Sequence, residues 1–378
     1  MESISTQIRE YMRKFLLMGN YLLWLILSPS KFIKINKKEI KNVLIISLGT
    51  IGELLVLTTI LSSLKKELNC KISFMISNES KNIFKNNPNI SEVIINQNNF
   101  WKNVENLKKK KFDLVIITKP VSTKYSLMCL LAKIKYQIGI GDLGMNVGKG
   151  PPLFFNKNFL SLKRQHVIEG CLDIIRQIGI NNKNPKMEFY FSKKDEKKAK
   201  EKLKKLKIKD YVVIHPGFGG AGKIKYPAKL WPLERYAKIV DFIIKNYKIN
   251  VLITGSKKEK KFADKIIEKI ENKGGVINVG GLFNLEELAY IISKTKLIIA
   301  PNTSVVHFAS VFNSPLIELD GVGRPYQWKP WRKDKNYKIL FHDEVCTGCN
   351  GTECRKKTTE CMKAINVEEV EKAIRQFL

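Results

Sequence analysis

Acidic residues are scarce in this sequence. Its 378 residues include 35 Asp and Glu against 67 Lys and Arg, which gives a formal net charge of +32 at pH 7. The imbalance predicts an anionic partner, although lysine runs such as residues 108–111 are equally typical of a solvated face. Tracts rich in Pro, Ser or Gln are also missing, which argues against a long disordered region and predicts a mostly ordered chain.

The sequence also lacks an apolar run of the roughly 20 residues that a membrane-spanning helix needs. The nearest candidate, residues 15–27, is interrupted by a Gly-Asn pair and has basic residues on both sides. Residues 28–30 (Ser-Pro-Ser) make a poor cleavage site, which argues against a signal peptide. Residues 1–40 are therefore predicted to form an interfacial helix on an anionic membrane, with a helix packed on the first domain as the alternative.

A complete disulfide framework is not expected because the seven cysteines are odd in number, and we predict a reducing compartment. Three cysteines in apolar surroundings are typical of small core residues: Cys70, Cys129 and Cys171. Four more have the spacing C-x2-C-x4-C-x6-C near the C-terminus: Cys346, Cys349, Cys354 and Cys361. Four thiolates could close a structural zinc site, but the second C-x2-C pair is missing, so reduced cysteines that pack a compact tail are the alternative.

Strand-like apolar runs alternate with amphipathic segments along most of the chain. The first series of predicted strands is 43–47, 72–76, 93–95 and 114–118, and a helix is predicted at 54–68. After a charged helix within 192–210, the second series is 211–215, 251–254, 276–279 and 297–300. This alternation predicts an α/β fold of two Rossmann-like domains, each a parallel sheet with helices on both faces, which face a cleft.

The same pattern predicts where the domains begin and end. Residues 41–185 form the N-terminal domain, residues 186–342 the C-terminal domain, and residues 343–378 a Cys-bearing tail with a short helix. Ligands of such sheets bind beyond the carboxyl ends of the strands. Chemistry is therefore expected in the turns that follow four residues: Ser47, His215, Thr254 and Ala300.

The first of these turns carries an acidic residue at the start of a helix. Gly49 and Gly52 permit a tight turn and a close approach of the backbone to a ligand, and Glu53 follows them. A carboxylate in this place can act as a base. The spacing is equally compatible with a first-turn glutamate that complements the helix dipole.

The second turn begins at His215 and contains a glycine-rich stretch. Residues 217–223 fit the G-x-x-x-x-G-K pattern of a phosphate-binding loop, which gives a nucleotide hydrolase or kinase as an alternative function. Ile224 stands where such a loop needs Ser or Thr for magnesium, and Pro227 breaks the helix that should begin there. Lys229 is predicted to project just ahead of the next helix, which starts near Pro232.

The third turn leads into an apolar helix. Asn302, Thr303 and Ser304 are residue types that cap helix N-termini, and the first-turn N–H groups would be available to a diphosphate. Ordinary capping is the alternative for all three. His307 lies on the apolar helix itself, where a buried core histidine is the simpler interpretation.

These motifs, in this order and spacing, resemble the heptosyltransferase-type family of glycosyltransferases (glycosyltransferase family 9), whose members transfer heptose from ADP-heptose to lipopolysaccharide core. The resemblance covers nearly the whole chain after residue 41. The matching segments are Gly52-Glu53 with Thr58-Thr59 (Gly-Asp and Thr-Thr in the family), 166–179 (H-x-x-E ending in Ile-Gly), 215–217 (H-P-G), 229–232 (K-x-W-P) and 302–309 (D-T-G-x-x-H-x-A).

The resemblance implies a GT-B architecture, with the acceptor on the N-terminal domain and the nucleotide sugar on the C-terminal domain. It also implies an inverting, metal-independent displacement at the anomeric carbon. Glu53 stands where the family has its general base, and Lys229 where it has the lysine that meets the donor phosphates. Glu259 matches a carboxylate that holds the ribose, and Thr303 and Ser304 match residues whose backbone N–H groups hold the diphosphate.

Two positions depart from the family pattern, since Glu53 and Asn302 each replace an aspartate. The first change lengthens the arm of the base by one methylene group. The second removes a negative charge beside the donor sugar and leaves the identity of that sugar open. His215, Gly217 and His307 complete the expected donor-binding set.

The predicted function is therefore transfer of a heptose or related sugar from an ADP-linked or similar donor to an envelope glycolipid. No cofactor is expected, because helix-end N–H groups and an ammonium can stabilise the leaving diphosphate. An anionic glycolipid or oligosaccharide acceptor and an anionic membrane surface would account for the excess of lysine, which places the enzyme on the cytoplasmic face of the inner membrane. Nucleic-acid binding is not expected, since no aromatic-interleaved basic motif is present.

Overall fold

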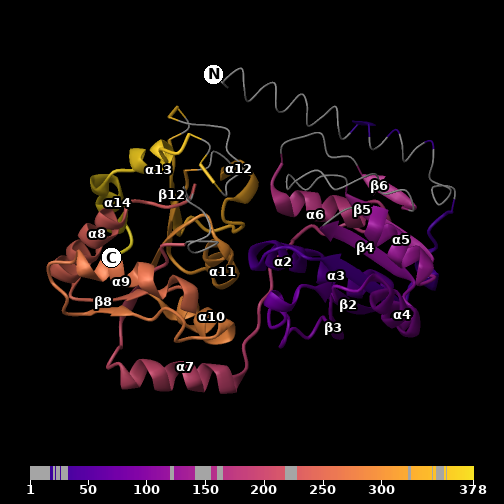
Figure 1. Ribbon diagram of the computed structural model, residues 1–378, viewed down its shortest axis with the longest axis horizontal. Coiled ribbons are helices and arrows are strands. Elements are labelled where there is room, and N and C mark those ends of the chain that lie inside the picture. Colours follow the sequence, from indigo (N-terminus) through magenta and orange to yellow (C-terminus); the bar gives the residue numbers. More distant parts are fainter. Residues whose placement is uncertain are drawn as a thin grey trace. The chain divides into compact units, whose positions relative to one another are not determined.

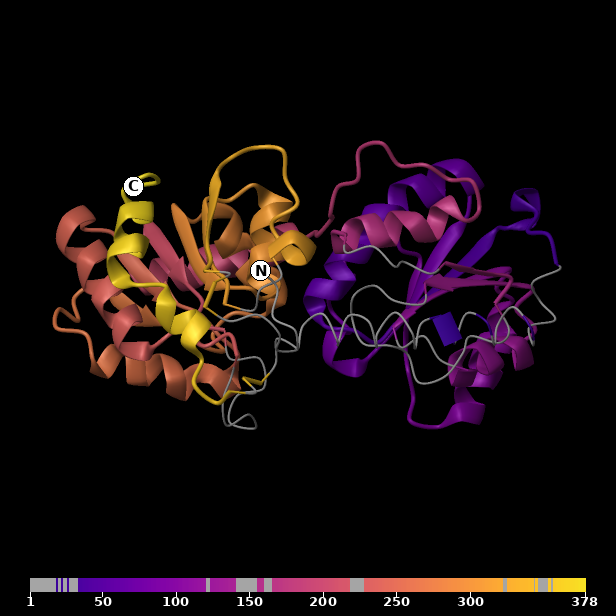
Figure 2. The same ribbon diagram turned by 90° about the horizontal axis from the view of Figure 1, so that it is seen from above.

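The computed structural model describes residues 18, 19, 22, 26, 33–119, 123–140, 155–159, 165–217, 228–321, 325–342, 344, 345, 353, 354 and 356–378. Most of the predicted N-terminal helix, residues 218–227 of the glycine-rich stretch, Cys346 and Cys349 lie outside these residues. The chain divides into two compact units, an N-terminal unit that ends at Tyr190 and a C-terminal unit that runs from Phe191 to Leu378 (Figure 1; Figure 2).

Six parallel strands form the sheet of the N-terminal unit, in the order β3-β2-β1-β4-β5-β6. Their bounds are β1 (Asn42–Ser47), β2 (Lys71–Ile76), β3 (Glu92–Ile95), β4 (Leu114–Lys119), β5 (Tyr136–Ile140) and β6 (Lys157–Phe159). The chain reverses its direction of travel across the sheet between β1 and β4. Ligands of doubly wound sheets bind at this switch point, outside the carboxyl ends of the two strands.

Helices cover both faces of this sheet. They are η2 (Lys37–Glu39), α2 (Ile51–Leu57), η3 (Thr58–Ile60), α3 (Leu61–Leu68), η4 (Asn78–Ser80), α4 (Phe100–Lys110), α5 (Thr123–Leu131) and α6 (Val167–Arg176). Leu44 and Ile46 of β1 belong to the buried cluster that includes α4 and α5 residues. Val43 and Ile45 alternate with them along the strand and are also fully buried, so the opposite face is covered too.

The helix predicted at 54–68 is present as three consecutive pieces, α2, η3 and α3. The hydroxyl groups of Thr58 and Thr59 donate to the backbone carbonyl groups of Leu55 and Val56, three residues earlier. Such bonds compete with the helical ladder and distort it locally. The 3-10 turn between the two α-helices therefore follows from the Thr-Thr pair.

The C-terminal unit repeats the same topology. Its six strands are all parallel and have the order β12-β11-β10-β7-β8-β9, which places the switch point between β7 and β10. Their bounds are β7 (Tyr211–Ile214), β8 (Asn250–Ile253), β9 (Val276–Asn278), β10 (Leu297–Pro301), β11 (Leu316–Leu319) and β12 (Tyr337–Leu340).

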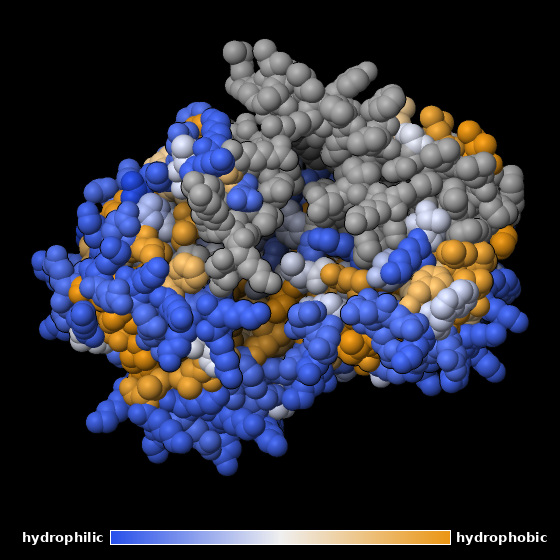
Figure 3. All heavy atoms as spheres, in the orientation of Figure 1, coloured by the Kyte–Doolittle hydropathy of each residue, from blue (hydrophilic) through white to orange (hydrophobic). Residues whose placement is uncertain are grey.

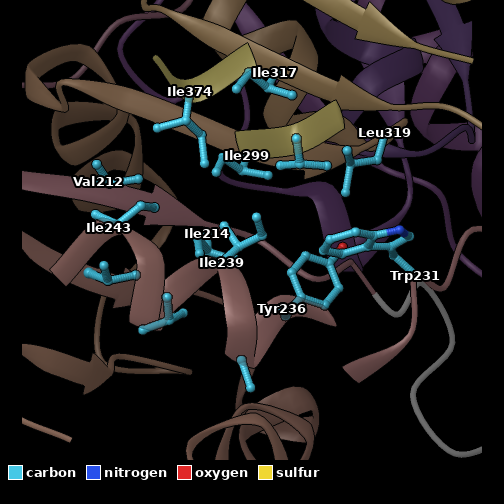
Figure 4. Close-up of a cluster of buried hydrophobic side chains, with 14 of the residues drawn as sticks. Val212, Ile214, Trp231, Tyr236, Ile239, Ile243, Ile299, Ile317, Leu319 and Ile374 are labelled. Carbon is cyan, nitrogen blue, oxygen red and sulfur yellow. The ribbon is translucent and has the colours of Figure 1, made fainter. Parts of the chain in front are cut away.

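The helices of the C-terminal unit are α7 (Lys193–Lys205), α8 (Leu233–Tyr247), η5 (Lys257–Glu259), α9 (Lys260–Glu268), α10 (Leu285–Lys294), α11 (Ser304–Phe312), α12 (Pro325–Trp328), α13 (Glu360–Ala364) and α14 (Val367–Ile374). Aliphatic side chains of the strands pack with α8, α9 and α14 in one buried cluster (Figure 4). Trp231 and Tyr236 meet edge to face at 4.9 Å in it, and the Trp231 indole N–H donates to the Ile365 carbonyl at 2.9 Å. This bond ties the segment before α8 to the C-terminal tail.

The predicted α/β fold of two parallel sheets is confirmed, and the eight predicted strands are present with ends shifted by at most one residue. Four strands were not predicted: β5, β6, β11 and β12. Of these, β11 matters for function, because it lies beside β10, at whose carboxyl end the third motif turns into its helix.

The cysteines that the structure describes are reduced and buried: Cys70, Cys129, Cys171, Cys354 and Cys361. Burial raises the pKa of the Cys70 thiol to about 11 and raises those of Cys129 and Cys171 further. Within the described ranges, no group of three His, Cys, Asp or Glu side chains is placed to hold a metal ion. None of the helices in those ranges has both the length and the apolar character needed to cross a membrane.

Candidate active site

The first strand-end turn lies between β1 and α2, at the switch point of the N-terminal sheet. Glu53 stands in the first turn of α2, and its side chain is only 10% exposed. Its Oε2 accepts a hydrogen bond from the Thr50 backbone N–H at 2.6 Å. The carboxylate therefore stabilises the start of its own helix, as the spacing allowed. Its role as a base stays a prediction.

Lys119 holds the other oxygen of the same carboxylate. Its Nζ lies 2.6 Å from Glu53 Oε1, and it comes from the end of β4, the strand next to β1. Both oxygens of Glu53 are therefore engaged, which fixes the direction of the side chain. We did not single out Lys119 from the sequence, but a signal was present, since it directly follows the predicted strand at 114–118.

The two glycines of this turn have different surroundings. A Cβ atom on Gly49 would lie 2.3 Å from Glu53 Oε2, so only glycine leaves the carboxylate its place. Gly52 is buried within α2 itself, one residue before Glu53. The close approach predicted at this turn is therefore made at Gly49 by the carboxylate of the same motif.

In the C-terminal unit, the second and third motifs meet at the switch point. Gly217 has a φ of +65°, and a Cβ atom there would lie 2.7 Å from Thr303 Cγ2 and 2.8 Å from Pro301 Cγ. The turn after β7 therefore packs directly on the turn after β10, and glycine is required both by its backbone conformation and by the lack of space.

Lys229 reaches the same place from the segment before α8. Its Nζ donates to the Asn302 backbone carbonyl at 2.8 Å and lies 3.4 Å from Asn302 Oδ1. Neither acceptor carries a formal charge. The structure thus brings together three segments that are far apart in the sequence and places an ammonium group at the start of α11.

The N-terminus of α11 is built on Thr303 and Ser304. Thr303 is the N-cap residue with extended backbone angles, and its side chain makes no capping hydrogen bond. Its Oγ1 is buried and has no hydrogen-bond partner among the residues that the structure describes. The first N–H groups of a helix lack partners within the helix, so this turn offers donors to an anion.

His215 follows β7 and is neutral at physiological pH. Burial lowers the pKa of its imidazole, and the negative charge of Glu259 only partly offsets the effect. Its Nδ1 lies 3.1 Å from Thr254 Oγ1, at the end of β8. Glu259 accepts the Ser256 backbone N–H at 2.7 Å. His215 and Glu259 thus lie near enough to interact, and their role in donor binding stays a prediction.

His307 is buried on α11, with 5% of its surface exposed. Its ring meets that of Trp328 from α12 at 5.7 Å and an angle of 60°. The structure agrees with the interpretation of His307 as a buried core histidine. Any contact of His307 with a donor stays a prediction.

Two buried acids in this region were not predicted. Glu318 lies in β11 and is fully buried, and Asp320 follows the strand with 1% exposed. The amide nitrogen of Asn302 donates to Glu318 Oε1 at 2.8 Å. The signal in the sequence was a Glu and an Asp, two residues apart, directly after an apolar Leu-Ile pair.

The pKa of Glu318 is raised well above its ordinary value. Burial is the main cause and the charge of Asp320 adds to it, whereas the Asn302 hydrogen bond and the charge of Lys229 oppose it. Burial therefore favours the protonated form of this carboxyl group. This group stands directly behind the residue that holds the Lys229 ammonium.

The alternative of a nucleotide hydrolase or kinase finds no support in the described residues around its motif. In a phosphate-binding loop of that class, a helix begins at the Gly-Lys end of the motif. Here residues 228–232 are not helical, and α8 begins at Leu233. Lys229 acts instead on the turn after β10.

The model of glycosyltransferase family 9 (heptosyltransferase) matches residues 100–360. This chain belongs to glycosyltransferase family 9. It is therefore a glycosyltransferase, and the resemblance read from the motifs is confirmed. The lipopolysaccharide core heptosyltransferase OpsX of Haemophilus influenzae is 24% identical over 312 residues, which cover 81% of this chain and 86% of that protein.

Solved structures of the same family share the fold. The family 9 glycosyltransferase from Veillonella parvula superposes with a TM-score of 0.73 at 20% identity, over 91% of this chain and 98% of the other. The E. coli ADP-heptose LPS heptosyltransferase II also gives 0.73, at 18% identity, over 89% and 98% of the two chains. The predicted GT-B architecture is confirmed by these neighbours.

Proposed function

We propose that this glycosyltransferase moves heptose, or a closely related sugar, from an ADP-linked donor to a lipopolysaccharide-core acceptor. The observation that carries the proposal is the meeting of Lys229, the Gly217 turn and the α11 N-terminus at one switch point. An ammonium, a helix N-terminus and a tight glycine turn together suit a diphosphate. The names of the relatives, OpsX and ADP-heptose LPS heptosyltransferase II, support the choice of sugar, nucleotide and acceptor.

In the proposed reaction Glu53 accepts the proton of the acceptor hydroxyl while that oxygen attacks the anomeric carbon. Lys119 and the Thr50 N–H hold the carboxylate in one orientation, which is what a general base needs. Attack from the face opposite the leaving diphosphate would invert the anomeric configuration. Glu53 reaches this position with one more methylene group than aspartate, and its two hydrogen bonds remove the extra freedom.

Charge that builds on the departing diphosphate is met by Lys229 and by the N–H groups at the start of α11. Such preorganised donors stabilise the developing charge without a metal ion. Lys229 is already held at this place by two oxygens of Asn302, so its ammonium needs little rearrangement. We place the ribose near Glu259 and assign His215 as a neutral hydrogen-bonding group.

The acceptor is anionic, and its delivery at a membrane surface would favour a basic protein. The exposed face of α7 carries mainly lysine: Lys193, Lys194, Lys197, Lys198, Lys200, Lys204 and Lys205. Figure 3 shows hydrophilic side chains over much of the coloured surface in this view. Each basic residue near an anionic leaflet adds about 1 kcal/mol of attraction. We therefore propose peripheral association with the cytoplasmic face of the inner membrane.

A donor screen by thermal shift tests this function. A bound donor stabilises the folded state by mass action, so ADP-heptose should raise Tm more than UDP- or GDP-sugars at equal concentration, with EDTA present. ADP-mannose and ADP-glucose show whether Asn302 admits other sugars. Lys229→Ala should abolish most of the shift. Stabilisation by UDP- or GDP-sugars alone, or a shift that needs magnesium, would contradict the proposal.

A further inference from the structure

An extra residue at the end of β4 places Lys119 beside the turn that carries Glu53. The register between β1 and β4 shifts by one residue there, so that Ser47 pairs with Lys119 and not with Thr118. The Leu48 backbone N–H donates to the Lys119 carbonyl at 2.7 Å and fixes this end of the strand. Register shifts of the β-bulge type are common next to active sites, where they aim a side chain in a new direction.

The ion pair that results is largely shielded from solvent. The Glu53 side chain is 10% exposed and that of Lys119 is 29% exposed, with 2.6 Å between Oε1 and Nζ. Within the described part of the chain, neither residue has a second ion-pair partner. The pair is neutral as a whole. Its two charges depend on each other, because the loss of either one leaves the other without a counter-charge in a partly buried place.

The proposed reaction removes one of these two charges. The O–H bond of the acceptor breaks and its proton passes to Glu53, while the oxygen bonds to the anomeric carbon. ADP leaves with the electron pair of the bond that joined it to that carbon. Glu53 is then neutral, and the ammonium of Lys119 beside it has lost its counter-charge. An anionic group next to the reacting hydroxyl would restore the balance, and it would do so only as the proton moves.

We propose that Lys119 selects acceptors that carry a carboxylate or a phosphate beside the reacting hydroxyl. The inference rests on the proposed function, because it takes Glu53 as the base. Before transfer, Glu53 neutralises the ammonium, so an anionic acceptor gains little from it. As Glu53 takes up the proton, the ammonium pairs with the anion of the acceptor. The gain therefore appears in kcat, whereas a lysine that only bound acceptor charge would lower KM.

The test compares three acceptors at saturating ADP-heptose. They are the heptose-deficient lipopolysaccharide core, the same core after phosphatase treatment, and the same core after methyl esterification of its carboxyl groups. The two treatments show whether Lys119 meets a phosphate or a carboxylate. For the wild-type chain, we expect at least one treatment to lower kcat at least about ten-fold, the low end for a hydrogen bond to a charged group. Unchanged kcat after both treatments, or a change in acceptor KM alone, would overturn the proposal.

Lys119→Met keeps the length of the side chain and removes its charge. Its kcat should fall for every acceptor, because Glu53 loses a hydrogen bond, but the difference between treated and untreated acceptors should disappear. The ratio of the two kcat values is the informative quantity, since a base that is merely misplaced slows all acceptors alike. Lys119→Arg keeps the cation and should keep the ratio within a few-fold. A wild-type ratio in Lys119→Met would overturn the proposal and leave the proposed function intact.

Lys110→Met is the matched control. Lys110 is also a lysine of the N-terminal unit that pairs with a glutamate, Glu92, and its side chain is 27% exposed. Glu92 is the first residue of β3, so this pair lies at the opposite edge of the sheet from Glu53. The control should keep the wild-type ratio, and loss of the ratio here as well would overturn the proposal.

The comparison of acceptors with the wild-type chain depends on no variant, so it tests the proposal even where Lys119→Met does not fold. Absence of transfer to any of the three acceptors would instead overturn the proposed function, and this inference with it.

Discussion

Replacing Glu53 with glutamine removes the proposed base and changes little else in shape. The carboxylate accepts one hydrogen bond on each oxygen, from the Thr50 N–H and from Lys119, each at 2.6 Å. Glutamine offers only one acceptor oxygen, so its NH2 group must face one of these two donors. The variant therefore loses one charge-assisted hydrogen bond in addition to its basicity.

The size of each loss can be estimated separately. Leaving a partly buried donor unsatisfied costs about 1–3 kcal/mol of folding stability. Removal of a general base costs roughly 100- to 10,000-fold in rate. Donor binding is expected to be nearly unchanged, because none of the donor groups in the C-terminal unit is altered.

Glu287 provides an internal control for the structural part of this loss. It also stands in the first turn of a helix, accepts the Asn284 backbone N–H at 3.0 Å and pairs with Lys202 at 2.6 Å. Both donors of Glu287 meet its Oε2, so Glu287→Gln can keep both bonds on its amide oxygen and loses only the charge; it should lose less stability than Glu53→Gln and keep its activity. Steady-state kcat for both variants, at a temperature well below both Tm values, separates the two effects. If Glu53→Gln retains kcat within a few-fold of Glu287→Gln, Glu53 is not the base.

Three further substitutions each test one contact of the structure. Lys229→Ala should raise the donor KM by about 10- to 100-fold, because it removes a charge-assisted contact, and should raise the acceptor KM much less. The measurement is steady-state kinetics with each substrate varied in turn. A larger rise in the acceptor KM would contradict the assignment of Lys229 to the donor site. Gly217→Ala should lower stability by about 1–2 kcal/mol because of the positive φ, and it should weaken ADP binding because a Cβ atom has no space beside Thr303. An unchanged Tm would show that this position does not require glycine. Partial burial opposes the charge on His342, but hydrogen bonds and charges of Glu369 and Glu344 outweigh it and raise its pKa. The stabilisation by His342 is thus fully present below pH 6.5 and is lost as pH rises through the folded pKa. Denaturant titrations at several pH values should show that His342→Gln costs up to about 1 kcal/mol in acid and progressively less as pH rises above 6.5.

The fold could be predicted from sequence because the strong signals are local. β-branched runs such as those of β1 and β7 alternate with amphipathic helices, and a parallel sheet of this kind has few alternatives. β5 and β6 were missed because they lie on either side of a Gly/Pro-rich stretch, and β6 has only three residues. β11 was missed because Glu318 interrupts its apolar run, although in the structure that side chain is fully buried.

The site was predictable only in part for a related reason. Gly217, Lys229 and Thr303 stand at strand or helix ends that topology brings together, so their motifs could be found one at a time. Lys119 and Glu318 act through partners 66 and 16 residues away, and nothing local marks either contact. Pairing across a sheet depends on strand order, which the motifs alone did not determine.

The most direct test of the account is transfer itself. Purified chain is incubated with ADP-heptose and a heptose-deficient lipopolysaccharide-core acceptor in the presence of EDTA, and the acceptor is followed by mass spectrometry. The account predicts an acceptor heavier by one heptose with equimolar ADP release, and it predicts neither with Glu53→Gln. ADP release without a heavier acceptor, or transfer that Glu53→Gln leaves intact, would contradict it.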